Sequence, residues 1–123
     1  MSIISEQSTF CADIARLIQY VQGLGWAVSE GEGWRPDEMQ KIYFEQKKSL
    51  TMKNSHGDKL AHDFNFFQKN NGSFEWVTDR KRLQWIGDFW KALDPDHNKW
   101  GGEYKDKNGK PFEDVFHFER KIV

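Results

Sequence analysis

The sequence predicts an α+β fold, a small antiparallel sheet with helices packed on one side, from three observations. Apolar residues recur at helical spacing in two separated stretches, 10–21 and 83–93. Residues 60–67 alternate like a half-buried strand and lead into a turn signal, and residues 115–119 alternate again. Because the 123 residues contain no repeat and no linker composition, we expect a single domain, residues 1–123.

The first expected helix is defined by one apolar stripe. Its members recur at offsets of four, seven, eight and eleven residues: Phe10, Ile14, Leu17, Ile18 and Val21. Gly23 and Gly25 can end this helix, and the apolar run 26–28 then reads as a brief strand. Cys11 is the only cysteine and lies beside the stripe, so we expect a buried thiol rather than a reactive or metal-binding one.

A second helix and a hairpin are expected next. Pro36 followed by two acidic residues has the chemistry of a first helical turn. After a polar loop, even-numbered residues from Leu60 to Phe66 would share the core face of a strand, and odd-numbered residues from Ala61 to Phe67 the other face. The turn signal at 70–72 predicts a return strand.

The last third of the chain predicts one more helix and one more strand. Thr78 or Asp79 can cap a helix that ends at Asp94. Its apolar stripe is Leu83, Ile86, Phe89, Trp90 and Leu93. A turn-rich region follows, and then a final strand with Phe116 and Phe118 facing inward.

Composition excludes several classes of function. The net charge is −1, from 18 basic and 19 acidic residues, so we expect no nucleic-acid partner. The N-terminus has no basic region before a continuous apolar run, and no segment is long enough to span a bilayer, so we expect no signal peptide and no membrane insertion. Six Trp, ten Phe and three Tyr predict a core of large rings.

Three potential metal ligands are expected to look outward from the sheet. If Phe64 faces the core, Asp63 faces away from it, and His56 lies where the polar loop meets this strand. His117 has the parity opposite to its inward-facing neighbours. If the two strands are neighbours, two imidazoles and a carboxylate converge, which is the three-ligand set of a catalytic zinc site with a position left for water.

Asp114, three residues before His117, is a candidate base for such a water. In an ideal strand the two residues point to opposite faces, so this role predicts a bend or turn between them, which Pro111 and its polar neighbours favour. The residue types alone also allow a simpler interpretation: His56 as a solvated loop residue, Asp63 as a strand-edge charge, and His117 as a half-exposed strand residue.

Order and spacing connect these residues to a known pattern. His56, Ala61 and Asp63 occupy the His, Ala and Asp positions of the motif S-x-H-x-x-G-x-A-x-D. Residues 114–119 match a late motif in which an acid precedes a final histidine by three positions.

Two further segments complete the match. Residues 33–36, followed by Gln40, are similar to an upstream arginine segment, and residues 100–104 to a Trp-Gly-Gly signature. With all four motifs in order, the chain resembles the LAS family of zinc metallopeptidases, which contains D-alanyl-D-alanine carboxypeptidases, D-Ala-D-Ala dipeptidases and phage L-alanyl-D-glutamate endopeptidases. Residues 60–67 look most like the phage and prophage branch.

The chain departs from the family motif at two positions. Asn54 stands in the serine position, with Ser55 next to it, and Lys59 stands in the glycine position. Neither departure removes a metal ligand, but both bear on the conformation of the loop before the strand.

The resemblance implies roles for five residues. Zn²⁺ would be bound by His56, Asp63 and His117, at the sheet. Asp114 would be the catalytic base. Arg35 resembles the family arginine that contacts substrate, where a guanidinium can pair with a carboxylate or with the oxyanion of the tetrahedral intermediate.

Three other residues have two interpretations each. Gln40 would bind substrate or is an exposed helix residue, and Trp100 would line the substrate groove or is a buried aromatic beside a glycine turn. Glu119 shares parity with His117, so it would orient a ligand or face solvent.

The activity implied by the resemblance is hydrolysis of an amide bond in the peptidoglycan stem peptide, most specifically by a phage or prophage L-alanyl-D-glutamate endopeptidase, an endolysin. A D-Ala-D-Ala carboxypeptidase and a non-catalytic module that binds wall peptide are the alternatives. We expect a monomer that is made in the host cytoplasm and reaches the wall through a separate pore protein.

Overall fold

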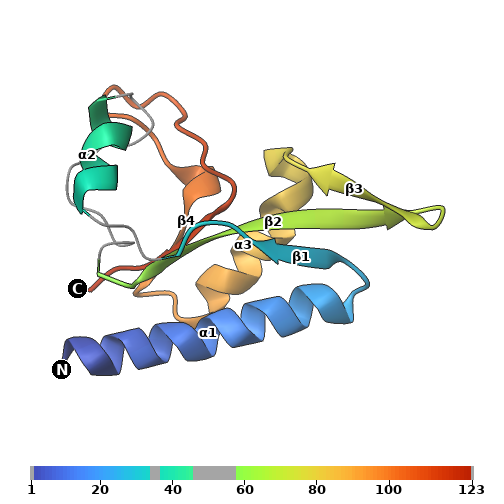
Figure 1. Cartoon of the computed structure of the whole chain (residues 1–123), viewed down its shortest axis with the longest axis horizontal. Coiled ribbons are helices and arrows are strands. Elements are labelled where there is room, and N and C mark those ends of the chain that lie inside the picture. Colours follow the sequence, from blue (N-terminus) through green and yellow to red (C-terminus); the bar gives the residue numbers. More distant parts are fainter. Residues whose placement is uncertain (1, 34–36, 46–57, 123) are drawn as a thin grey trace.

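The computed structural model describes residues 2–33, 37–45 and 58–122, and its α+β architecture confirms the predicted fold class (Figure 1). The elements in chain order are α1 (Ile3–Gly23), β1 (Ala27–Glu30), α2 (Asp37–Glu45), β2 (Ala61–Asn70), β3 (Ser73–Val77), α3 (Arg80–Leu93), β4 (Asn98–Trp100), the 3-10 turn η1 (Gly101–Glu103) and β5 (His117–Arg120). None of the described helices is long and apolar enough to cross a membrane.

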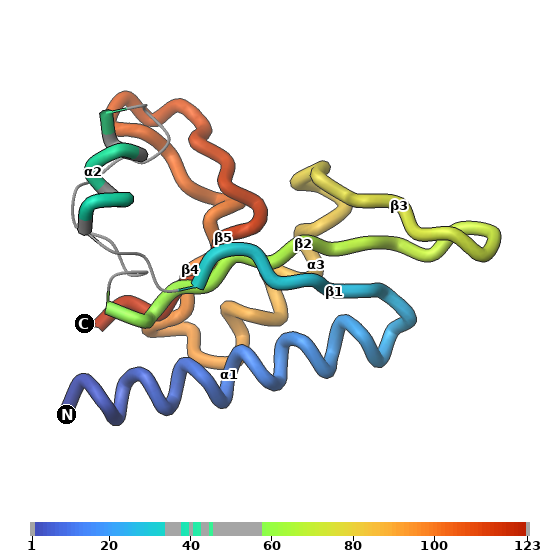
Figure 2. Tube along the Cα trace, in the orientation of Figure 1, coloured from blue at the N-terminus to red at the C-terminus, as the bar shows by residue number. Residues whose placement is uncertain are grey.

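The ten-residue strand β2 organises an antiparallel sheet. One edge of β2 pairs with β1. The other edge is shared, because residues 61–63 pair with β5 and residues 66–70 pair with β3. β4 then pairs with β5, so the C-terminal strands extend one end of the sheet while the β2–β3 hairpin extends the other (Figure 2).

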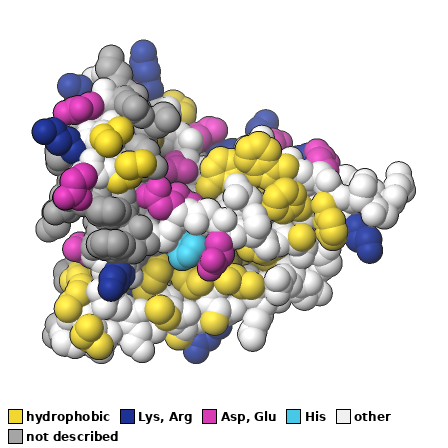
Figure 3. All heavy atoms as spheres, in the orientation of Figure 1, with side chains coloured by type: hydrophobic (Ala, Val, Ile, Leu, Met, Phe, Trp, Pro, Cys, Tyr) yellow, Lys and Arg dark blue, Asp and Glu magenta, His cyan; other side chains and the backbone are white. Residues whose placement is uncertain are grey.

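The core lies on the face of the sheet covered by α1 and α3 (Figure 1). The predicted parity of β2 is confirmed, since Phe64 and Phe66 are both 1% exposed. Both helical stripes contribute the residues that were expected to be inward, among them Phe10, Leu17, Val21, Leu83, Ile86 and Trp90. The odd-numbered residues of β2 face the opposite side, and Figure 3 shows hydrophobic side chains over β3 at one end, where Phe74 and Trp76 are exposed.

Several boundaries differ from prediction. α1 begins at Ile3, a full two turns before the apolar stripe, because the Ser2 side chain caps it by accepting a hydrogen bond from the Ser5 amide at 3.1 Å. β4 was not predicted, since three residues carry too little pattern. Cys11 is exposed, which corrects the expected buried thiol: it follows Phe10 by one residue, and this rotates it about 100° from the stripe.

The final strand is also shorter than predicted, because it begins at His117 and residues 115–116 form a turn. Phe118 is fully buried as expected. Phe116 also packs against the core, but it is only partly buried and stacks on Trp76, with the ring centroids 5.8 Å apart.

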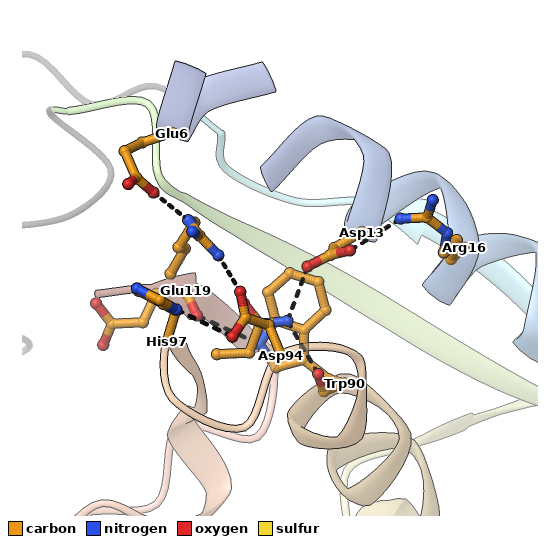
Figure 4. Close-up of polar contacts among 9 residues, drawn as sticks. Glu6, Asp13, Arg16, Trp90, Asp94, His97 and Glu119 are labelled. Atoms are coloured by element: carbon orange, nitrogen blue, oxygen red, sulfur yellow. Dashed lines mark hydrogen bonds and ion pairs between the residues drawn. The ribbon is translucent and has the colours of Figure 1, made fainter. Parts of the chain in front are cut away.

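A partly buried ionic cluster joins α1 to the C-terminal strand (Figure 4). Arg120 of β5 donates from Nε to Glu6 at 2.5 Å and from Nη1 to Asp94 at 2.6 Å. His97 Nδ1 lies 2.9 Å from the other oxygen of Asp94. We call Glu6, Arg120, Asp94 and His97 the clasp, because the contacts join the first turns of α1 to the end of α3 and to β5.

Candidate active site

The register of two neighbouring strands brings Asp63 and His117 together on the face of the sheet opposite the core. Asp63 of β2 and His117 of β5 are direct partners in the antiparallel pairing, so their side chains project to the same face. Asp63 Oδ1 lies 3.3 Å from His117 Nδ1. Both side chains are largely enclosed, with exposures of 24% and 12%. The predicted convergence of these two residues is therefore present.

A turn carries Asp114 to the same place. The amide of His117 donates to the Asp114 carbonyl at 3.1 Å, and this closes the bend that the candidate base required. The Asp114 amide in turn donates to the carbonyl of Gly101 at 2.9 Å. The turn is thus hydrogen-bonded to the start of η1 as well as to β5.

Close packing explains why the residue after Trp100 is a glycine, Gly101. A Cβ on Gly101 would lie 2.3 Å from the Asp114 carbonyl oxygen, and also 2.9 Å from the Cβ of His117 and 3.1 Å from the Cβ of Asp114. No side chain can occupy that space. Because one point lies so near both Cβ atoms, the side chains of Asp114 and His117 start from adjacent positions.

The position of Trp100 corrects its predicted role in the substrate groove. Its side chain is 1% exposed, and its Nε1 donates to the Val115 carbonyl at 3.0 Å. The indole lies against Gly87 of α3 and Gly102 of η1, where a Cβ on either glycine would overlap the ring. The Trp-Gly-Gly segment therefore acts as a packed support beneath the Asp114–His117 turn, and the alternative of a buried aromatic is confirmed.

Glu119 faces the second ring nitrogen of His117, the one that does not face Asp63. Its Oε1 is 3.3 Å from His117 Nε2, and its side chain is only 8% exposed, so it does not simply face solvent. The Tyr104 hydroxyl donates a hydrogen bond to the same carboxylate oxygen. Strand parity had made Glu119 a candidate to orient His117. Tyr104 was missed, because nothing in the sequence links a residue after η1 to β5.

The remaining predicted residues fall outside what the structure describes. His56 and Arg35 lie in the segments 46–57 and 34–36, and the side chain of Gln40 is likewise outside, although its backbone belongs to α2. Their roles stay predictions.

Lys59, which stands in the family glycine position, has φ +60°. It therefore keeps the left-handed backbone that a glycine adopts easily, at the entrance to β2.

The chemistry of the described donors fits part of a zinc site. A carboxylate oxygen and a neutral imidazole nitrogen are both zinc ligands, and two donors about 2.1 Å from a tetrahedral ion lie roughly 3.4 Å apart, close to the spacing of Asp63 and His117. In residues 2–33, 37–45 and 58–122, no three His, Cys, Asp or Glu side chains are grouped so as to hold a metal. The third proposed ligand, His56, lies outside these ranges.

Comparisons with known proteins support the fold. The sequence matches no protein-family model and no curated protein. Among solved structures, the crystal structure of the Serratia marcescens L-Ala D-Glu endopeptidase ChiX is similar, with a TM-score of 0.67 and 20% sequence identity over 91% of this chain and 77% of that chain. At this level of identity the likeness establishes a shared α+β architecture.

Proposed function

We propose that the protein is a zinc-dependent peptidase that hydrolyses the L-alanyl-D-glutamate bond of the peptidoglycan stem peptide. The observation that carries the proposal is the direct pairing of Asp63 with His117, with Asp114 on the hydrogen-bonded turn beside them. The named activity of the similar Serratia protein supports the same substrate.

The proposed roles follow from the donor types. His56, Asp63 and His117 would hold the ion, which would supply Lewis-acid activation of a water and of the scissile carbonyl. Asp114 would take the proton of the attacking water and pass it to the leaving amine. Arg35 would pair with a carboxylate of the substrate or with the developing oxyanion.

The biological setting is part of the proposal. As a phage or prophage endolysin, the protein would be made in the host cytoplasm, pass through a separate pore protein and act on the wall as a monomer. Its partner would be the stem peptide, and the near-neutral net charge of −1 fits the absence of a polyanion partner.

The test is hydrolysis of purified peptidoglycan followed by identification of the new termini. Release of a free amino group on glutamate supports the proposal, and release of terminal D-alanine alone would instead indicate a carboxypeptidase. Activity should disappear after chelation and return when Zn²⁺ is added. Binding of wall fragments without any new termini would identify a non-catalytic module.

A further inference from the structure

The two ring nitrogens of His117 face different carboxylates. The inference drawn from this arrangement rests on the proposed function. Nδ1 faces Asp63 at 3.3 Å, while Nε2 faces Glu119, also at 3.3 Å. Because the two nitrogens lie on different edges of the imidazole, Glu119 approaches from the edge away from Asp63. Its carboxylate is therefore not placed to bind the same ion as Asp63.

We propose that Glu119 and Tyr104 form a positioning pair that fixes the ring orientation and tautomer of His117. A neutral imidazole carries one N–H, and an N–H at Nε2 that points to the carboxylate leaves the lone pair of Nδ1 on the side of Asp63. The sequence of contacts runs from Tyr104 to Glu119 to His117.

The backbone around Tyr104 is suited to this role. The Tyr104 amide donates to the Gly101 carbonyl at 3.1 Å, and its carbonyl accepts from the Phe112 amide at 2.8 Å. The backbone of Tyr104 is thus fixed by hydrogen bonds through both its amide and its carbonyl, which fixes the origin of the side chain. The ring centroid of Tyr104 lies 5.7 Å from that of His117. Since Gly101 also receives the Asp114 amide, one glycine anchors both the candidate base and the residue that orients Glu119.

The experiment compares Zn²⁺ affinity, measured by competition with a chromophoric chelator, for the wild type and for Glu119→Gln, Glu119→Ala and Tyr104→Phe. Loss of such partners typically weakens metal binding about 10- to 100-fold. We expect Zn²⁺ affinity to fall about 100-fold in Glu119→Ala, and about 10-fold in Glu119→Gln and Tyr104→Phe. Glu119→Gln keeps an oxygen acceptor, and Tyr104→Phe keeps the ring.

Two matched controls test the same chemical changes elsewhere. Glu113 is exposed, so Glu113→Gln should keep the wild-type affinity. Tyr20 lies near the C-terminal end of α1 and stacks on Phe89, so Tyr20→Phe should also keep it. The absorption spectrum of the Co²⁺-loaded protein gives a second readout, which should change for the Glu119 and Tyr104 variants and not for the controls.

The outcomes separate this inference from the proposed function. A wild type that binds Zn²⁺ and cleaves the wall, with Glu119→Gln and Tyr104→Phe of equal affinity and unchanged Co²⁺ spectrum, overturns the positioning pair and leaves the proposed function standing. A wild type that does not bind Zn²⁺ overturns both. If Glu119→Ala fails to fold, the two conservative variants decide.

Discussion

Adjacent residues of β5, Glu119 and Arg120, belong to two polar clusters that are built in opposite ways. Arg120 of β5 points into the core side, where a permanent cation lies between Glu6 and Asp94 (Figure 4). Glu119 points to the open side, where the partners are the imidazole of His117 and the phenol of Tyr104. An arginine does not lose its proton in proteins, whereas an imidazole can exchange a proton or bind a metal ion.

The difference separates a structural role from a chemical one. In the clasp, charges from α1, the end of α3 and β5 compensate one another, so its contribution is to hold distant parts of the chain together. In the candidate active site, the side chains of Asp63, His117 and Asp114 are positioned by the strand register and by the Gly101 contacts. They therefore do not have to hold the fold together, and their hydrogen bonds can change during a reaction. Changes in the clasp should therefore alter stability, and changes in the site should alter activity.

The largest expected effect is on activity, from Asp114→Asn. An amide is isosteric with the carboxylate but cannot accept the proton of the attacking water, so turnover should fall about 10²- to 10⁴-fold. Zn²⁺ binding and the melting temperature should remain near those of the wild type. Wall hydrolysis, metal titration and thermal unfolding measure the three quantities, and retained turnover would remove Asp114 as the base.

The next effect is on stability, from Arg120→Ala. This change leaves the buried carboxylate of Glu6 without its cation, and removing one partner of a buried ion pair typically costs about 3–5 kcal/mol of unfolding free energy. Urea unfolding measures the loss. Arg82→Ala is the control, because its pair with Glu75 is solvent-exposed and should contribute much less to stability. Equal losses for the two variants would contradict the role of the clasp.

A smaller effect should appear in acid. The contact with His97, followed by that with Arg120, holds the pKa of Asp94 below its ordinary value. A carboxyl whose folded pKa is depressed stabilises the protein above its unfolded pKa of about 3.9, and this contribution is lost as the pH falls further. The melting temperature of the wild type should thus fall more steeply below about pH 5 than that of Asp94→Asn. Parallel curves would show that Asp94 does not contribute.

Strand periodicity explains how much of the site the sequence could predict. A period of two assigns Asp63 to the face opposite Phe64, and the same parity assigns His117 and Glu119 to one face of β5. The sequence also indicated that Asp114 needs a turn. These assignments follow from local geometry alone, and the pairing of β2 with β5 then brings the residues together.

The rest depended on contacts between distant parts of the chain. Glu6 and Arg120 are 114 positions apart, so no local pattern could pair them. Trp100 beside two glycines has the same sequence whether the indole is buried or lines a groove, and only the position of α3 decides between the two. Phe116 alternates like a strand residue, but the hydrogen bond from His117 to Asp114 makes it part of a turn.

The smallest predicted effect is on the free energy of unfolding, from Lys59→Gly. Lys59 lies outside both the clasp and the candidate active site. Its φ of +60° is costly for a residue with a Cβ, and Lys59→Gly should stabilise the protein by about 1 kcal/mol, less the extra entropy that glycine adds to the unfolded chain. The turn at Lys59 leads directly into Leu60, whose carbonyl accepts the Arg120 amide at 2.8 Å. Urea unfolding and wall hydrolysis should show a gain in stability with unchanged activity. Lys69→Gly, at the second-to-last position of β2, is the control and should lower stability, because glycine is disfavoured in a strand. If Lys59→Gly is destabilising instead, the side chain of Lys59 contributes more than its backbone conformation costs.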